Sequence, residues 1–169
     1  VYALAVWNPA LCTCLKRALP RYEDERTVTV FEDALDRTYF AGNAAQLASE
    51  EDDDSRCLRR FFQMEIDRIN LRTVIQTKGG HEAAQQVIDR ILPEGTIHRQ
   101  TLVRMALAHD VVEAMEYLGS TSYTRLVEGL YRHLETARFT PLEREFELVL
   151  LQDLRRMARV HVFTIAVVM

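Results

Sequence analysis

The chain has 169 residues, of which 48% are hydrophobic and 27% are charged, and its formal net charge is −4. This length and composition suit one ordinary domain or two small helical domains with a real hydrophobic core. A negative balance leaves no excess of basic residues to neutralise phosphates, so no nucleic-acid partner is expected.

Cysteine usage and the longest apolar run place further bounds on the chain. The three cysteines, Cys12, Cys14 and Cys57, form an odd set without an extracellular pattern, which predicts reduced thiols in a cytoplasmic setting. The longest apolar run, residues 160–169, is shorter than the roughly 20 residues that a membrane-spanning helix needs. No direct membrane span is therefore expected. Because both ends are apolar, we interpret the chain as an internal fragment of a longer protein.

The first predicted helix begins at an asparagine that is followed by a proline. Asn8 can cap the helix, and Pro9 suits its first position because the N–H that proline lacks would have no helical partner there. Apolar residues recur at helical spacing until Pro20, which is predicted to end the helix. Residues 20–29 are polar and are predicted to form a loop.

The second predicted helix is capped by Thr27 or Thr29 and continues to about Ala48. An acidic run, SEEDDDS, follows at residues 49–55. We interpret this run as a solvated loop that also supplies negative charge to the next helix N-terminus. Metal binding is the alternative, but adjacent carboxylates without a glycine turn do not form an EF-hand loop.

The longest predicted helix spans about residues 54–78. Its apolar side chains cover much of its circumference, which predicts that it is buried on more than one side. Gly79 fits the left-handed position just beyond the helix. Ionisable and apolar residues are mixed in its octapeptide EIDRINLR, residues 65–72.

Further helices are predicted in the rest of the chain. They are expected at about residues 82–92 and 97–108, from Asp110, from residues 120–122 to about Leu134, and from Thr140 without a stop signal before Met169. Asp110 with Glu113, and Thr140 with Glu143, form capping-box patterns. Because no strand alternation or hairpin dipeptide is found, the sequence predicts an all-α fold.

A weak internal repeat appears when the chain is shifted by 111 residues. Both aligned segments contain a helix, a polar loop and a threonine-capped long helix. This pattern predicts a multi-helix domain repeated in tandem, with residues 1–110 as the first unit and residues 111–169 as the start of a second, truncated unit. A chance match between two amphipathic helical hairpins is the alternative.

Motifs for catalysis, cofactors and metals are not found in the sequence. It has no glycine-rich phosphate loop, no HExxH motif and no nucleophile elbow. Cys12 and Cys14 resemble half of a zinc site, but paired zinc ligands are usually separated by two or more residues and no second pair follows. We therefore expect no catalytic residue, cofactor or bound metal.

The polar residues of the long helix are the main candidate site. Asp67 and Asn70, three residues apart, share a helix face, whereas Glu65 and Asp67, two apart, point to different sides and do not form an acid/base pair. We interpret Glu65, Asp67, Asn70 and Arg72 as a structural motif whose polar groups satisfy one another and neighbouring helix ends. Direct contact with a partner protein is the alternative.

The octapeptide resembles a motif of the C-subunit family of archaeal A-type and V-type ATP synthases, which is related to the d subunit of V-ATPases. The family helix reads roughly Glu-x-Asp-x-x-Asn-Leu-Arg and is followed by a basic residue and a glycine, which Lys78 and Gly79 supply here. Other family landmarks follow the same order as in this chain: a Leu-Asp-x-x-Tyr helix at residues 32–39, a Leu-Pro-Gly-Gly turn at 91–97, a Thr-x-Tyr helix start at 121–123, and the run before the last motif copy at 155–159. In the turn, Glu94 replaces the first glycine.

The resemblance implies a non-catalytic coupling subunit made of three similar all-helical domains that form a funnel. Such a subunit links the central-shaft subunits, of the D and F type, to the membrane proteolipid ring of a proton- or sodium-driven rotary ATP synthase. It lies on the cytoplasmic side of the cell membrane, and this chain would cover its middle domain and the first part of the third. A stand-alone helical adaptor is the alternative, and an enzyme that uses Glu65, Asp67 and a histidine is a third hypothesis.

Overall fold

The computed structural model describes residues 8–78, 83–119, 121, 123–127 and 140–160. Every regular element in these ranges is an α-helix, which confirms the all-α prediction for the part of the chain that the structure describes. The chain divides into two compact units, with the division between Ser49 and Glu50. The tandem repeat with units 1–110 and 111–169 stays a prediction. Among the described helices, none combines the length and apolar character needed to cross a bilayer.

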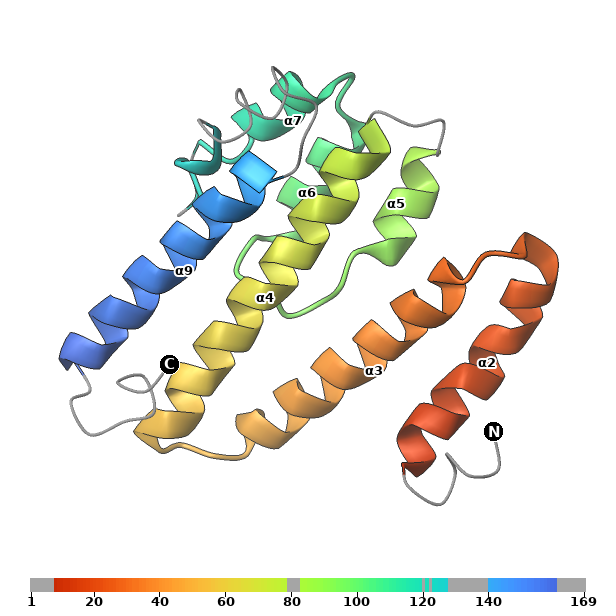
Figure 1. The fold of residues 1–169 in the computed structure, drawn as a ribbon, viewed down its shortest axis with the longest axis horizontal. Coiled ribbons are helices and arrows are strands. Elements are labelled where there is room, and N and C mark those ends of the chain that lie inside the picture. The colour runs from red at the N-terminus through yellow and green to blue at the C-terminus, as the bar shows by residue number, and fades with distance from the viewer. Residues whose placement is uncertain (1–7, 79–82, 120, 122, 128–139, 161–169) are drawn as a thin grey trace. The chain divides into compact units, whose positions relative to one another are not determined.

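The first unit contains α2 (Pro9–Glu25) and α3 (Thr29–Ala48), which pack side by side (Figure 1). The start of α2 is as predicted, because Oδ1 of Asn8 accepts a hydrogen bond from the N–H of Leu11 at 3.1 Å. The end of α3 at Ala48 is also as predicted. Local capping chemistry therefore fixes one boundary of this unit, as expected from the sequence.

Two predictions about the turn between α2 and α3 are wrong. Pro20 lies inside α2, which continues to Glu25. Pro20 has no N–H to bond the carbonyl group of Lys16, but both residues are exposed, so water can satisfy that carbonyl. The turn beyond Pro20 is held by Tyr22, whose ring centroid lies 4.8 Å from that of Phe31 on α3.

The predicted threonine cap of α3 is the second error. Val28 occupies the cap position with helical backbone angles, φ −66° and ψ −25°, rather than the extended angles that side-chain capping requires. The hydroxyl groups of Thr27 and Thr29 are hydrogen-bonded to each other at 3.2 Å. The predicted polar loop at residues 20–29 is thus reduced to residues 26–28.

The second unit is built around one long helix. It contains α4 (Asp53–Lys78), α5 (Ala84–Arg90), α6 (Arg99–Leu107), α7 (Val111–Glu116) and α9 (Thr140–Val160). Figure 1 shows α9 running along α4, while α5, α6 and α7 gather beside the later half of α4. All four helices contact α4, which confirms that it is buried on more than one side.

The core of this unit lies between the later half of α4 and its neighbours. Leu71 and Val74 of α4 are completely buried there, together with Met105 of α6, Leu118 and Leu126. Burial of side chains of this size stabilises the fold by about 1.5–3 kcal/mol each. The second unit therefore has a hydrophobic core of its own.

The acidic run before α4 acts partly as a helix start. Oδ1 of Asp52 accepts the N–H of Ser55 at 2.9 Å, and the hydroxyl group of Ser55 donates to Oδ2 of Asp52 at 2.7 Å. These hydrogen bonds lower the pKa of Asp52 below its ordinary value. Asp53 and Asp54 follow in the first turn, where negative charge interacts favourably with the positive end of the helix dipole.

The predicted start of α7 is also confirmed. Oδ1 of Asp110 accepts the N–H of Glu113 at 2.9 Å, and Oε2 of Glu113 accepts the N–H of His109 at 2.6 Å. Three expected features lie outside the described residues: Gly79 beyond α4, most of the helix expected at about 120–134, and the last helix beyond residue 160.

Candidate functional site

Asp67 lies at the centre of a buried polar junction on α4. It is 0% exposed and accepts hydrogen bonds from two backbone N–H groups, that of Thr96 at 3.0 Å and that of Ile97 at 3.1 Å. The phenol group of Tyr123 donates to Oδ2 of Asp67 at 2.8 Å, and the hydroxyl group of Thr96 donates to the same oxygen. One carboxylate therefore ties α4 to the loop before α6 and to the segment that follows α7.

Asn70 holds the other end of the same loop. Its Nδ2 donates to the carbonyl oxygen of Leu92 at 2.9 Å, and the N–H of Leu92 donates to Oδ1 of Asn70 at 2.7 Å. Both residues are buried, so the two bonds satisfy backbone groups that water cannot reach. The three-residue spacing places Asp67 and Asn70 toward the same loop, as the helical geometry predicted.

Gly95 allows this loop to approach the carboxylate. A Cβ atom on Gly95 would lie 2.2 Å from Oδ1 of Asp67, so no side chain fits there without movement. Its neighbour Glu94 has φ 70°, in the left-handed region that favours glycine. The loop therefore has no room for a side chain at Gly95 and a strained backbone at Glu94.

Burial and hydrogen bonding act in opposite directions on the junction's ionisable groups. Burial raises the pKa of Asp67 above its ordinary value, although its hydrogen bonds from Thr96, Ile97 and Tyr123 lower it in part. Burial and the nearby carboxylate of Asp67 also raise the pKa of Tyr123 far above its usual range. The phenol therefore remains protonated and donates to the carboxylate. Since Asp67 has no exposed surface, a substrate cannot reach it for acid or base chemistry.

The other two residues of the predicted motif lie elsewhere on α4. Oε2 of Glu65 lies 2.7 Å from Nη2 of Arg68, in a partly exposed ion pair. Nη1 of Arg72 lies 3.6 Å from Oε1 of Glu143 on α9, and both of these side chains are about half exposed. The structure thus brings Asp67 and Asn70 together and places Glu65 and Arg72 outside the junction.

Thr96 and Tyr123 were not identified from the sequence as partners of Asp67. They lie within two of the segments that resemble family landmarks, residues 91–97 and 121–123. The signal was therefore present in the order of the landmarks, although nothing in the sequence pattern indicated that they meet at one carboxylate.

Additional polar contacts brace α4 against its neighbours. The ammonium group of Lys78 donates to the carbonyl oxygen of Ala106 at 2.6 Å and also to that of Ala108, at the end of α6. Nε of Arg60 lies 2.7 Å from Oδ2 of Asp153 on α9. These contacts extend the connection of α4 to α6 and α9 beyond the junction.

The described cysteine and histidine residues do not assemble a metal centre. Within the described ranges, no group of three or more histidine, cysteine or acidic residues is placed to hold a metal ion. All three cysteines are buried and form no disulfide bond, and the thiol of Cys14 donates to the carbonyl oxygen of Ala34 at 2.9 Å. His98 caps α6 by accepting the N–H of Gln100 at 3.4 Å. His81, His133 and His161 lie outside the described residues.

In the part of the chain that the structure describes, every regular element is a helix, and the most buried polar residues, Asp67 and Asn70, bind backbone groups of the same chain. Residues 5–169 match the model of the ATP synthase (C/AC39) subunit family, and the chain belongs to that family. The C subunit of A-type ATP synthases is a non-catalytic, structural component. The resemblance found in the sequence is thus confirmed.

Curated relatives agree with this membership. The chain is 29% identical to the C subunit of the A-type ATP synthase of Methanothermobacter thermautotrophicus over 147 residues, which cover 86% of this chain and 37% of that protein. It is 24% identical to the corresponding C subunit of Thermococcus onnurineus, covering 84% and 38% of the two chains, and 26% identical to that of Thermococcus kodakarensis, covering 82% and 37%. No solved structure matches significantly. The chain spans somewhat more than a third of the length of these relatives.

Proposed function

We propose that this chain forms part of a coupling subunit of an A-type rotary ATP synthase, which links the rotating central shaft to the membrane proteolipid ring. The observation that carries this proposal is the family match over residues 5–169. Membership of a family of ATP synthase subunits favours this role over that of a stand-alone adaptor. The partners would be shaft subunits of the D and F type on one side and the proteolipid ring on the other.

The buried junction supports a mechanical role for the domain. A part that transmits torque between two partners must resist deformation, and close-packed protein interiors are stiff enough to transmit strain. Asp67 and Asn70 fix both ends of the loop at residues 91–97, and Tyr123 adds a third segment to the same carboxylate. We infer that these residues act as structural ties and that partner contacts are made by the outer surface.

The proposed location is the cytoplasmic side of the cell membrane, as a peripheral component of the complex. There the protein would serve ATP synthesis or hydrolysis by passing rotation between shaft and ring, without catalytic residues, a cofactor or a metal of its own. Its ion dependence would follow from the ring, because the ring and not this component carries the ions.

Reconstitution of the full-length protein tests the proposal. The protein would be mixed separately with a complex of the D- and F-type shaft subunits and with the isolated proteolipid ring, and binding would be followed by analytical ultracentrifugation. We expect complexes with both at micromolar concentration. The catalytic subunits without the shaft serve as the control and should not bind. Failure to bind either the shaft complex or the ring contradicts the proposal.

A further inference from the structure

A second feature of the molecule, separate from the junction, is a groove between α2 and α3 in the first unit. Its volume is about 660 Å³. Small side chains, including Ala10, Ala18 and Ala34, line it. The distance between two packed helices depends on the side chains at their contact, so these three alanines let a further helix approach closely. The shape of this surface therefore suits a helix better than it suits a flat partner.

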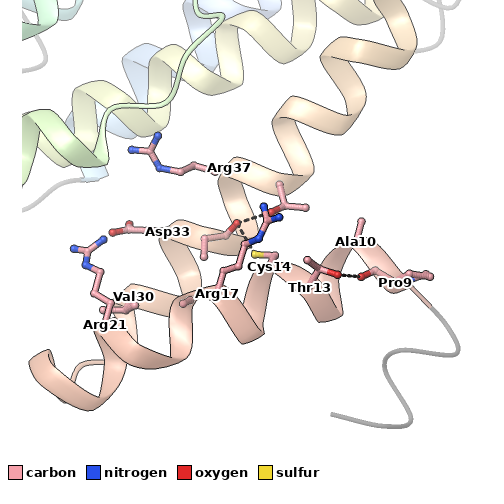
Figure 2. Close-up of a pocket in the computed structure, with 12 residues that line it drawn as sticks. Pro9, Ala10, Thr13, Cys14, Arg17, Arg21, Val30, Asp33 and Arg37 are labelled. Carbon is pink, nitrogen blue, oxygen red and sulfur yellow. Dashed lines mark hydrogen bonds between the residues drawn. The ribbon is translucent and has the colours of Figure 1, made fainter.

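Three arginines accompany this apolar lining. Arg17 and Arg21 lie one turn apart on α2, and Arg37 comes from α3 (Figure 2). Asp33 is the one acidic residue among the described residues that line the groove. Among the described residues, the lining carries three positive charges and one negative charge, whereas the whole chain has a net charge of −4. Nε of Arg21 lies 2.5 Å from Oε1 of Glu25 on the same helix, so this ion pair offsets one of the three positive charges. The groove is therefore a locally positive surface on a chain whose net charge is negative.

The combination of these two properties indicates the chemistry of the occupant. An amphipathic helix places apolar residues at i, i+3, i+4 and i+7 into a hydrophobic groove. Carboxylates that flank its apolar face would meet arginine side chains, whose planar groups bind carboxylates through two parallel hydrogen bonds. A nucleic acid would match the arginines but not the apolar lining, and it would be repelled by the negative charge of the chain.

We propose that the groove between α2 and α3 docks an acidic amphipathic helix of a partner protein. The inference rests on the proposed function only for the partner's identity as a component of the ATP synthase. Complementary charge fixes the register and the on-rate of such a contact, and the apolar lining supplies the buried area. Binding should therefore depend on both the arginines and the small side chains.

A labelled peptide tests the groove on the full-length protein. The probe is a fluorescein-labelled helical peptide with leucines along one face and glutamates beside them, and the matched peptide carries lysines in place of the glutamates. Fluorescence anisotropy at low salt should show binding of the acidic peptide and not of the basic one. The affinity should fall as salt is added, because salt screens exposed charges.

Three variants distinguish the groove from general electrostatic attraction. Arg17→Glu should weaken binding of the acidic peptide about tenfold or more, because it replaces attraction by repulsion. Ala10→Trp should weaken it to a similar extent by filling the groove without a change in charge. Arg104→Glu makes the same charge change at an exposed residue of α6 and should leave binding unchanged. Equal binding by wild type, Arg17→Glu and Ala10→Trp would overturn the proposal.

A photo-crosslinking residue at Thr13, which lines the groove and is exposed, identifies the natural occupant in the assembled complex. Crosslinking to an acidic helix of another protein of the complex supports the proposal. Crosslinking within the same chain, or to a second copy of it, overturns the proposal because the groove is then covered by the protein itself. If the peptide binds as expected but the shaft and ring do not, the groove stands and the coupling function fails. If the shaft and the ring bind but the peptide does not, the docking role of the groove is rejected and the coupling function stands.

Discussion

Replacing Asp67 by asparagine tests the junction at its centre. Asparagine has nearly the same shape but offers one acceptor oxygen and one amide donor where Asp67 offers two acceptor oxygens. The amide oxygen can retain the three bonds made by Oδ2, to Tyr123 and to both donors of Thr96. The amide nitrogen then faces the N–H of Ile97, which lies 3.1 Å from Oδ1 in the native protein.

The expected cost follows from this mismatch. A buried backbone N–H without an acceptor costs about 1–3 kcal/mol. Removal of a buried carboxylate relieves part of this cost, since burial already raises the pKa of Asp67. We therefore expect Asp67→Asn to lower the free energy of unfolding by about 1–3 kcal/mol at neutral pH. The amide of Ile97 should also exchange with solvent faster than in wild type.

Urea unfolding gives the free energy, and hydrogen exchange measured by mass spectrometry on residues 91–98 gives the local effect. Glu65→Gln is the matched control on the same helix, because the pair of Glu65 with Arg68 is partly exposed. It should cost at most about 1 kcal/mol. If Asp67→Asn unfolds at the same urea concentration as wild type and its loop exchanges no faster, the junction contributes no stability and the structural interpretation is wrong.

Three further predictions concern the same junction. The pKa of Asp67 is higher in the folded state than its unfolded value of about 3.8. The stability that this shift contributes is therefore fully present below pH 3.8 and is lost as the pH rises through the folded-state pKa. The difference in free energy of unfolding between wild type and Asp67→Asn should accordingly become smaller from acid to neutral pH in urea titrations. Glu94→Gly should relieve the strain of a left-handed residue and raise the free energy of unfolding by up to about 1 kcal/mol. A lower melting temperature than that of wild type would contradict the interpretation that Glu94 is strained. Gly95→Ala should destabilise the fold because its Cβ atom clashes with Asp67. Its control, Gly42→Ala, lies at an exposed helical position with free space and should stabilise the protein by about 0.5–1 kcal/mol in the same thermal melts.

Features that depend on neighbouring residues could be predicted from the sequence. The cap of Asn8 on α2 and that of Asp110 on α7 each involve a hydrogen bond to a residue three positions later. That Asp67 and Asn70 lie on the same face of α4 follows from their three-residue spacing on a helix. Residue type and spacing within a few positions are enough to predict features of this kind.

Features that depend on exposure or on distant segments could not be predicted in this way. Whether Pro20 ends a helix depends on whether the carbonyl of Lys16 reaches water, which is a property of the folded unit. The partners of Asp67 lie 29 residues away at Thr96 and 56 residues away at Tyr123, and no periodicity connects them. The resemblance to a family indicated those segments, but their convergence required the structure.

The hydrogen bonds of the junction explain what a buried carboxylate contributes at position 67 of this chain. An apolar residue at position 67 could be as stabilising, because burial of a charged group costs free energy that its contacts must offset. It would not, however, fix the position of the loop, since apolar contacts have little directionality. A carboxylate that accepts the N–H groups of Thr96 and Ile97 together with the phenol of Tyr123 is satisfied in one arrangement only. Gly95 then lets the loop approach close enough to form it. On the proposed function, the gain is a single stiff arrangement of the domain, and stiffness is the property that a rotating coupling component requires.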